Sequence, residues 1–489
     1  MTSSAICDRF GEVAARDRDR TAIFAPAEKQ HRTFGQLWDD YRAVAVALDG
    51  LRLPPGGPCV SIVGNASGFV PLVLACLEGR RPLVLLDGGA SSSQAGDAAH
   101  RFGACAIVGT VDDMTSFPDP TSLPAGLAAT ILDDPANGSL DPATAVLKMT
   151  SGSSAVPKGV QVTDQALIND GSHIIEAMNL RPHDVNLAVI PLAHSYGFGN
   201  LVMPLLLQGS SMVLRPQFDA RQLLADIDAF NATVLPAVPF IFDYLVRLES
   251  APSPLSRLHL AITAGAPITF EVIRAYAERF SRKIHAFYGT SETGGIAYDD
   301  SAELDTAVPV GRPMPETSVS LVAQPGRPGD EGRVHVVGNA LGLGYASADD
   351  EPEPGAFVDG GFLTGDLARR DREGRLVLTG RVSRFVNVAG RKVHPEEVER
   401  VIGQATGVDD VLVLGVPWPA RGEVMVACVR CPEPRMTAES LRLHCSERLP
   451  PYKVPRSFLF LESFPVDARG KIDRDALARL AAGTTLRDR

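Results

Sequence analysis

Cysteine is scarce in this sequence. The chain of 489 residues contains seven cysteines, an odd number that is spread over its length. They are Cys7, Cys59, Cys76, Cys105, Cys428, Cys431 and Cys445. A scaffold held together by disulfides has many paired cysteines, so this pattern argues against that class and suits a reducing compartment. We therefore expect a cytoplasmic protein.

An excess of positive charge is also missing. The 47 Lys and Arg residues are outnumbered by 58 Asp and Glu, which gives a net charge of −11 and disfavours binding to nucleic-acid phosphates. The chain begins with charged residues before any apolar run, so we expect no secretory signal. One uncharged stretch, 195–214, is long enough to cross a membrane, but its glycines and Pro204 indicate a loop, a buried helix and a turn. We expect no membrane span.

Short apolar runs alternate with amphipathic stretches from about residue 20 to 375. Chain length alone predicts about three lobes, at roughly 150 residues each. Apolar runs that predict buried strands lie at 58–64, 82–88, 186–192 and 259–265. Apolar residues recur every three or four positions at 34–48 and 221–230, which predicts helices. This alternation is typical of α/β sheet architecture.

The pattern changes twice toward the C-terminus. Residues 324–380 are richer in glycine and charge and predict a small, mostly antiparallel β region. Beyond it, strands are expected at 384–389, 411–416, 424–430 and 457–462, and helices at 395–403 and 437–448. This part is about 105 residues long, a plausible size for an independent domain. We place the boundary at 380–384 and expect domains at 1–380 and 381–489.

The segment KMTSGSSAVPKGV at 148–160 is the strongest local signal. Glycine allows backbone N–H groups to turn inward, hydroxyls add donors, and Lys158 adds a point charge, so the segment suits a polyphosphate. It differs from the G-x-x-x-x-G-K-[ST] loop because its lysine precedes the glycine. A flexible Ser/Gly turn is the alternative.

Four further segments are weak when taken singly. ITAGAPI at 262–268 could present backbone to a nucleobase, and HAFYGTSETGG at 285–295 places hydroxyls beside Glu292, a pattern that suits phosphate and Mg²⁺. FLTGD at 362–366 offers Asp366 to ribose hydroxyls, and ARGKIDR at 468–474 carries a lone lysine. Ordinary surface turns are the alternative for each.

Together, in this order, the five segments resemble the motifs of the adenylate-forming superfamily, which includes acyl- and aryl-CoA synthetases, luciferases and peptide-synthetase adenylation domains. The resemblance covers about residues 20 to 480. It implies a large N-terminal α/β domain with a small β region and a small, mobile α+β C-terminal domain. It also implies ATP, Mg²⁺ and coenzyme A, or the phosphopantetheine of a carrier protein.

The resemblance assigns roles residue by residue. The β,γ-phosphates of ATP would contact Thr150, Ser151, Gly152, Ser153, Ser154 and Lys158. The rest of the nucleotide would contact Gly265, Ala266, Pro267, Tyr288, Gly289, Thr290, Ser291, Asp366 and Arg381, with Tyr288 on the adenine and Ser291 at the α-phosphate. Glu292 would hold Mg²⁺, and Lys471 would bridge the attacking carboxylate and the ribose. Gly390 would line the pantetheine tunnel, and Ser383 would be the hinge about which the C-terminal domain rotates between half-reactions.

Three positions depart from the usual family pattern. Ser154 and Ala155 stand where Thr-Gly is usual, Ser383 stands at a hinge that is commonly Asp or Lys, and Ser291 replaces Thr with the same hydroxyl. The change at Ser383 affects the hinge assignment, because Ser383 is itself the assigned hinge residue.

The segment PLAHSYG at 191–197 matches the P-x-x-H-x-Y-G segment of acyl- and aryl-CoA synthetases and luciferases. His194 would lie near the carboxylate; a core histidine is the alternative. Amino-acid-activating domains place an Asp where this chain has Tyr196, and a buried ammonium needs such a partner, so α-amino acids are disfavoured. The acid would contact His194, Tyr196, Phe198, Val238, Phe240, Ala264, Gly294 and Gly295, which suits an aryl or medium-length aliphatic acid.

Cys428, Cys431, His444 and Cys445 have a spacing similar to that of zinc ligands. The alternation at 424–429 predicts a strand with Cys428 on the same face as Val424, and adjacent helical residues point about 100° apart. Zinc is therefore disfavoured.

The sequence thus predicts an ATP-dependent ligase that forms an acyl-adenylate and then a thioester with coenzyme A. The small-molecule partner is a carboxylic acid. The main alternative is an enzyme that loads an acyl carrier protein. A non-catalytic adenylate-binding protein and a luciferase-like oxidative second step are weaker alternatives.

Overall fold

The structure is a computed structural model that describes residues 4–132, 140–150, 158–216, 218–248, 257–324, 329–346, 356–382, 386–388, 391–393, 395–418, 422–431, 436–449, 451–466 and 472–485. The chain divides into two compact units, Met1–Thr379 and Gly380–Arg489. The sequence positions 151–154, 383, 390 and 471, to which roles were assigned, lie outside the described residues.

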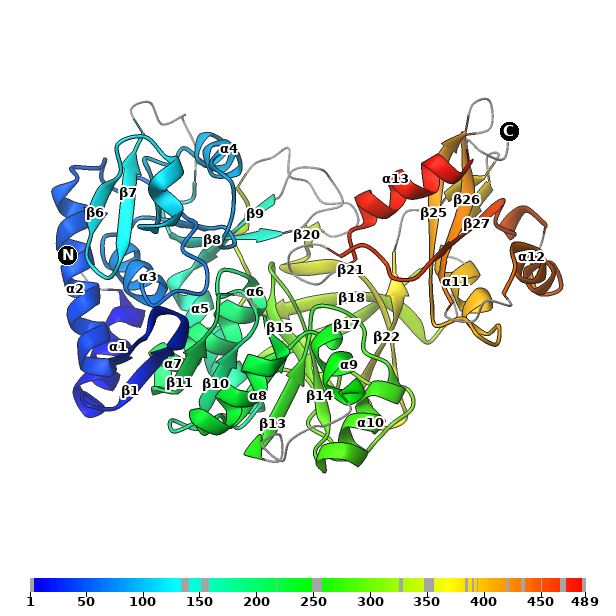
Figure 1. Ribbon diagram of the computed structural model, residues 1–489, viewed down its shortest axis with the longest axis horizontal. Helices are drawn as coiled ribbons and strands as arrows, with labels where there is room; N and C mark the ends of the chain where they lie inside the picture. Colours follow the sequence, from blue (N-terminus) through cyan, green and yellow to red (C-terminus); the bar gives the residue numbers. More distant parts are fainter. Residues whose placement is uncertain are drawn as a thin grey trace. The chain divides into compact units, whose positions relative to one another are not determined.

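The larger unit contains a nine-stranded sheet, several strands of which are labelled in Figure 1. In spatial order its strands are β16 (Arg312–Pro313), β15 (Gly294–Tyr298), β14 (Ile284–Thr290), β13 (Leu260–Thr263), β12 (Val234–Ala237), β10 (Val185–Ala188), β11 (Ser211–Leu214), β1 (Thr21–Ala25) and β2 (Gln30–Thr33). The strands from β14 to β1 are parallel to one another, and β2, β15 and β16 are antiparallel additions. Because carboxyl ends of parallel strands meet at one edge, the segments that follow β10, β12, β13 and β14 meet there.

Helices cover both faces of this sheet. One face packs against α8 (Ala220–Ala229), α9 (Pro239–Arg247) and α10 (Phe270–Phe280). The other face packs against α1 (Ala5–Arg16), α2 (Phe34–Gly50), α3 (Phe69–Glu78), α5 (Asp164–Ala177) and α7 (Met203–Gln208). Helix α3 is buried along almost its whole length, as its nearly all-apolar sequence requires.

The second large sheet has eight strands and shares that helical layer. In spatial order they are β19 (Gly344–Tyr345), β9 (Lys158–Thr163), β8 (Thr144–Thr150), β4 (Leu83–Leu85), β3 (Cys59–Ser61), β5 (Ala106–Thr110), β7 (Leu127–Ile131) and β6 (Thr121–Leu123). One hydrophobic cluster includes residues of both sheets and of the helices between them. Helix α4 (Ser92–Phe102) covers the outer face of the second sheet.

A third, five-stranded sheet completes the larger unit. It contains β17 (Thr317–Ala323), β18 (Glu331–Gly338), β20 (Ala356–Val358), β21 (Gly361–Arg370) and β22 (Leu376–Arg381), whose last two residues belong to the smaller unit. The pairs β17–β18, β18–β21 and β20–β21 are antiparallel, as expected for 324–380. Tyr288 and Ile296 pack with its apolar residues, so the sheet is fixed to the β14–β15 hairpin.

The smaller unit is a sheet with helices on both faces. Its strands are β24 (Arg391–Val393), β23 (Val386–Val388), β26 (Gly422–Arg430), β25 (Asp410–Trp418) and β27 (Ser457–Leu461), the last parallel to β26. Helices α11 (Pro395–Gly403) and α12 (Ala438–Ser446) pack on one face, and α13 (Arg474–Thr485) packs on the other. The expected fold class, α/β with a large N-terminal and a small C-terminal domain, is confirmed.

The uncharged stretch 195–214 contains several short elements. It forms α6 (Ser195–Gly197), a π-helix at Phe198–Val202 labelled η3, then α7 and β11. In the part of the chain that the structure describes, no helix is both long and apolar enough to cross a membrane. The remaining short helices are η1 (Pro26–Glu28), η2 (Asp113–Ser116) and η6 (Pro451–Lys453).

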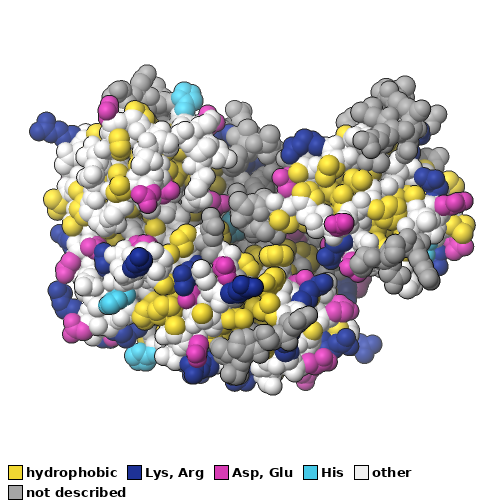
Figure 2. Space-filling view, in the orientation of Figure 1, with side chains coloured by type: hydrophobic (Ala, Val, Ile, Leu, Met, Phe, Trp, Pro, Cys, Tyr) yellow, Lys and Arg dark blue, Asp and Glu magenta, His cyan; other side chains and the backbone are white. Residues whose placement is uncertain are grey.

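Charges of both signs are mixed on the face of the molecule that Figure 2 shows. Among the coloured residues on the face shown in Figure 2, Lys and Arg side chains are interspersed with Asp and Glu and form no continuous basic field.

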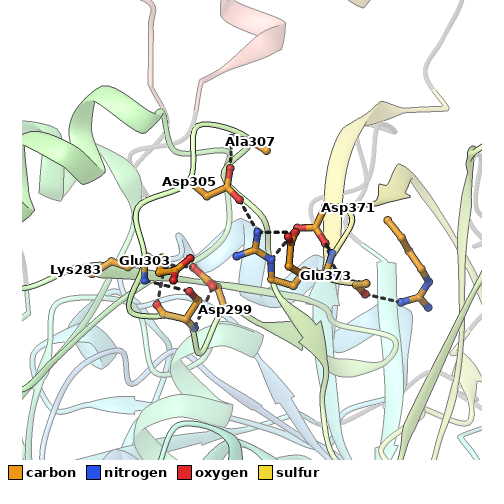
Figure 3. Close-up of polar contacts among 11 residues, drawn as sticks. Lys283, Asp299, Glu303, Asp305, Ala307, Asp371 and Glu373 are labelled. Atoms are coloured by element: carbon orange, nitrogen blue, oxygen red, sulfur yellow. Dashed lines mark hydrogen bonds and ion pairs between the residues drawn. The ribbon is translucent and has the colours of Figure 1, made fainter.

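A polar network anchors the loop between β15 and β16 (Figure 3). Arg375, which is almost buried, forms ion pairs with Asp305 at 2.5 Å and Asp371 at 2.7 Å. At the other end of the loop, the Lys283 ammonium pairs with Asp299 at 2.7 Å and donates to the Ser301 carbonyl. These contacts join the loop to the third sheet and to the start of β14, and so brace the hairpin that carries Glu292.

Candidate active site

The turn between β14 and β15 presents the hydroxyl and carboxyl groups of the YGTSE segment. The hydroxyls of Thr290 and Thr293 are 3.1 Å apart. Gly294 has a left-handed backbone with φ of +69°, and a Cβ at Gly289 would lie 2.6 Å from the Gly294 carbonyl oxygen. Glycine is therefore required on both sides of the turn. Glu292 is only 9% exposed.

Glu292 is held by a tyrosine from another part of the chain. The Tyr345 hydroxyl donates to Oε1 of Glu292 at 2.6 Å. Tyr345 belongs to β19, which pairs with β9, and the Lys158 ammonium at the start of β9 lies 5.8 Å from the centre of the Tyr345 ring. This distance suits a cation–π contact. One tyrosine thus contacts the carboxylate with its hydroxyl and the ammonium with its ring.

Of the phosphate loop, the structure describes the two ends, Thr150 and Lys158. Thr150 ends β8 and Lys158 begins β9, and the two residues are paired across the antiparallel ladder. The intervening residues, among them Ser151, Gly152, Ser153 and Ser154, lie outside the described residues. The β8–β9 hairpin brings the two ends of the loop together, and Tyr345 pairs with Val160, two residues after Lys158.

Tyr288 and Asp366 form a second polar contact. The Tyr288 hydroxyl donates to Oδ2 of Asp366 at 2.7 Å, and the Asp366 N–H donates to the Thr364 hydroxyl at 3.0 Å. The Tyr288 ring is buried, and Asp366 is half-buried on β21. These two residues, predicted to contact adenine and ribose, are therefore neighbours.

The segment after β13 is open to solvent. Gly265 has φ of +86°, a conformation that favours glycine, and Gly265, Ala266 and Pro267 are all exposed. It leaves the same sheet edge as the YGTSE turn. Both predicted nucleotide-binding segments therefore emerge at one edge.

His194 and Ser195 lie at the start of α6. The Tyr196 N–H donates to Nδ1 of His194 at 3.3 Å, which leaves the ring proton on Nε2 when the imidazole is neutral. The hydroxyls of Ser195 and Ser291 are 2.6 Å apart. The contact joins the PLAHSYG segment to the YGTSE turn. Ser195 was missed by the sequence reasoning, although it lies inside a motif.

Asn65 holds the strand-end segment that precedes His194. Its amide nitrogen donates to the carbonyls of Ala188 and Ile190 at 3.1 Å each, and its oxygen accepts the Leu192 N–H at 2.8 Å. No sequence signal that we used pointed to Asn65 or to Tyr345.

The predicted contacts of the acid fall into different environments. Tyr196 and Ala264 are buried, and the Tyr196 hydroxyl donates to the Ile262 carbonyl at 3.0 Å. Val238 is half-buried, whereas Phe240 on α9 is 51% exposed.

Two expectations about this wall need correction. Phe198 has no exposed surface and packs edge-on against Phe69, so it belongs to the core rather than to an open wall. Gly294 and Gly295, expected to leave room, instead lie against the Asp170 carboxylate: the Gly295 N–H donates to Oδ1 of Asp170 at 2.8 Å. A Cβ at Gly294 would collide with that carboxylate.

The residues around Glu292 fit a phosphate-bridging Mg²⁺. In the described ranges, no three His, Cys, Asp or Glu side chains are grouped as metal ligands. Mg²⁺ commonly takes one or two carboxylates and completes its shell with phosphate oxygens and water. A single carboxylate beside the hydroxyls of Thr290 and Ser291 suits that mode.

The zinc-like residues of the smaller unit are in separate environments. Cys428 packs in the cluster under α13, whereas Cys445 packs in the cluster under α11 and α12. Nε2 of His444 bonds the Val401 carbonyl at 2.9 Å. Burial raises the pKa of Cys428 to about 12 and that of Cys445 to about 11. In the same unit Arg381 is exposed at the end of β22.

Comparisons with known proteins agree with this arrangement. The sequence matches the AMP-binding enzyme family over residues 10–346 and the AMP-binding enzyme C-terminal domain over 397–471. It is 31% identical to sulfoacetate–CoA ligase of Cupriavidus necator over 74% of this chain and 72% of that protein. It is also 31% identical to indoleacetate–CoA ligase of Aromatoleum aromaticum, over 69% of this chain and 67% of that protein.

Solved structures show the same fold. ATP-bound MatB from Rhodopseudomonas palustris superposes with a TM-score of 0.82 at 21% identity, over 98% of this chain and 99% of that one. The chain belongs to the AMP-binding enzyme family, in its branch of AMP-forming acid–thiol ligases.

Proposed function

We propose that the chain joins an aryl or medium-length aliphatic acid to coenzyme A at the expense of ATP. In the first step, a carboxylate oxygen of the acid attacks the α-phosphorus, the bond from that phosphorus to pyrophosphate breaks, and an acyl-adenylate forms. In the second, the thiol sulfur attacks the acyl carbon, its proton is lost, and AMP leaves. The first step is needed because a free carboxylate would have to expel oxide, a very poor leaving group.

The observation that carries this proposal is the contact of Tyr345 with both Glu292 and Lys158. The acid and ATP are both anions, so their reaction requires positive charge at the phosphates. A carboxylate suited to Mg²⁺ and an ammonium suited to phosphate lie on two sides of one tyrosine. Mg²⁺, when bound, would offset phosphate charge.

The other residues of the larger unit take supporting roles. Thr150 and the loop 151–154 would bind the β,γ-phosphates together with Lys158, and Ser291 would contact the α-phosphate. The hydrogen bond between Tyr288 and Asp366 supports a shared adenosine subsite. His194, with its Nε2 proton, would donate toward the acid or the α-phosphate.

The smaller unit would supply groups for both steps. Lys471 would bridge the carboxylate and the ribose during adenylation, Arg381 would contact the ribose, and Gly390 would admit the pantetheine arm. Because Lys471 and Gly390 serve different steps, we propose that this unit rotates about Ser383 between them.

Coenzyme A is the favoured acceptor because several relatives are named as CoA ligases. Loading of a carrier protein remains the second candidate for the acceptor. A non-catalytic role is disfavoured because Lys158, Glu292, Asp366 and Lys471 are all present.

The test is mass spectrometry of the full chain with Mg-ATP, coenzyme A and a panel of aryl and C2–C16 acids. We expect an acyl-CoA whose formation falls about 10²–10³-fold in Lys471→Ala, the typical effect of removing one transition-state charge. Lys453→Ala is the matched control, because that lysine of the same unit pairs with Glu397. It should retain activity.

Acyl-AMP without acyl-CoA would favour a carrier protein as acceptor. The absence of both products with every acid would overturn the proposed activity.

A further inference from the structure

Asn200 is a buried amide with free hydrogen-bonding groups. It is 2% exposed, and neither its side-chain nitrogen nor its oxygen has a hydrogen-bond partner in the described residues. Each unpaired buried polar group costs about 1–3 kcal/mol. A residue kept at that cost is a candidate to bind a ligand group.

The position of Asn200 in the chain relates it to the acid. It lies in the centre of the π-helix Phe198–Val202, and π-turns within helical segments are frequent at functional sites. This helix follows His194 and α6 directly. Asn200 is six residues after His194, less than two helical turns, so one aromatic ring or a short chain can bridge the distance between them.

Asp170 links the π-helix to the Gly294–Gly295 backbone, which follows Glu292 in the YGTSE turn. A Cβ at Gly199 would lie 3.2 Å from Oδ2 of Asp170. The other carboxylate oxygen accepts the Gly295 N–H at 2.8 Å. Asp170 on α5 therefore contacts the residue before Asn200 and, on its other side, the Gly294–Gly295 backbone.

The charged side chains around Asp170 are paired with each other, and the nearby imidazole is neutral. Oδ2 of Asp170 lies 3.6 Å from the Lys148 ammonium, and the two side chains are 5% and 2% exposed. One helical turn after Asp170, burial lowers the pKa of His173, so this imidazole is neutral at pH 7. A second anion or a cation on the substrate would thus lack a free counter-charge among these groups, and burying it would be costly.

We propose that Asn200 binds a hydroxyl group on the acid, at the end remote from the reacting carboxylate. An amide offers one acceptor and donors, and a hydroxyl needs both an acceptor and a donor. The substrates are therefore hydroxy acids, aryl or aliphatic, that carry no charge besides the reacting carboxylate, rather than their deoxy parents or dicarboxylates. This inference rests on the proposed function, of which it narrows the substrate class.

The experiment compares matched acids on the full chain. The probes are benzoate with 4-hydroxybenzoate, phenylacetate with 4-hydroxyphenylacetate, hexanoate with 6-hydroxyhexanoate, and adipate. Pyrophosphate release gives kcat/KM for each acid. For the wild type we expect at least one hydroxy acid to exceed its parent by about ten-fold or more, because the parent leaves the amide unpaired. Adipate should be poorer than 6-hydroxyhexanoate.

The variant Asn200→Leu distinguishes a role of Asn200 in substrate binding from a role in the stability of the fold. It should reduce the hydroxy/parent ratio to about 1, retain activity on the parent acid, and leave Tm equal or higher, because an unpaired polar group is replaced by an apolar one. The matched control is Asn186→Leu. Asn186 is also buried, but its amide nitrogen donates to Ser210 and Ser211, so this variant should lower Tm and leave the ratio unchanged.

Failure of this inference and failure of the proposed function give different results. Equal use of both members of every pair, with no effect of Asn200→Leu on the ratio, overturns this inference and leaves the proposed function intact. No pyrophosphate release from any acid overturns the proposed function and the inference with it.

Discussion

The Tyr345 hydroxyl donates a 2.6 Å hydrogen bond to the Glu292 carboxylate, although the two residues are 53 positions apart. Tyr345 reaches Glu292 because β19 adds to the second large sheet at β9, next to the phosphate-loop hairpin. Glu292 follows β14 in the first large sheet. The contact therefore ties together the two sheets at the point where the predicted phosphate and Mg²⁺ groups lie.

Tyr345→Phe should weaken Mg²⁺ binding while retaining the ring beneath Lys158. Groups that orient a metal ligand typically affect metal affinity by about 10–100-fold when they are removed. The measurement is binding of Mn²⁺, as a paramagnetic substitute, to the protein with ATP, together with the Mg²⁺ dependence of pyrophosphate release. Tyr345→Leu removes the ring as well and should also raise KM for ATP. Unchanged Mn²⁺ affinity in Tyr345→Phe would contradict this role.

Ser195 and Ser291 should be energetically coupled. Their hydroxyls are 2.6 Å apart, so removal of either leaves the other without this partner. In a double-mutant cycle of Ser195→Ala and Ser291→Ala, we expect a coupling of about 0.5–3 kcal/mol in kcat/KM for pyrophosphate release. Effects that simply add would show that the contact does not position Ser291. Thr115→Ala, a surface threonine of η2, serves as a background control.

Asn65→Ala should lower both Tm and kcat. It removes three hydrogen bonds to the 188–192 segment, each worth about 1 kcal/mol. The shift of this segment would displace His194, so kcat should fall more than KM for ATP rises. Asn65→Asp keeps the acceptor for Leu192 but loses both donors. Its Tm and kcat should lie between those of the wild type and of Asn65→Ala, or below both. A lower Tm with kcat unchanged in the folded protein would limit Asn65 to a structural role.

Glu399 should make the smaller unit sensitive to pH. Burial, with a smaller contribution from nearby Glu396, raises the pKa of this carboxyl to about 7, despite the N–H that Val413 donates to it. The folded state therefore binds more protons than the unfolded state between about pH 4.5 and 7. Its contribution to stability is complete below that window and is lost as pH rises through it.

Glu399→Gln should flatten this dependence by up to about 1.4 kcal/mol per pH unit. The measurement is urea unfolding of the full chain between pH 5 and 8, in a Trp38→Phe background where Trp418 of the smaller unit is the sole tryptophan. Glu397→Gln, on the same helix but paired with Lys453, is the control and should keep the wild-type slope. An unchanged slope in Glu399→Gln would rule out Glu399 as the titrating group.

Much of the fold could be predicted because its signals are local. The runs at 186–192 and 259–265 contain β10 and β13, and the helix expected at 395–403 is α11 with the same bounds. Strands were predicted too long, since apolar residues continue past the last ladder hydrogen bond into buried loops. Phe198 was expected to contact the acid but is fully buried against Phe69, a packing contact between distant parts of the chain that no local pattern indicates.

The sequence by itself determined the family and the chemical class, because Lys158, Glu292 and Asp366 stand in short segments whose residue types suit phosphate, metal and ribose. Only the tertiary structure decided what supports them. Tyr345, Asn65 and Asp170 reach the site through strand pairing and helix packing over long sequence separations. Local patterns carry no information on such contacts, since register and packing are set by the whole core.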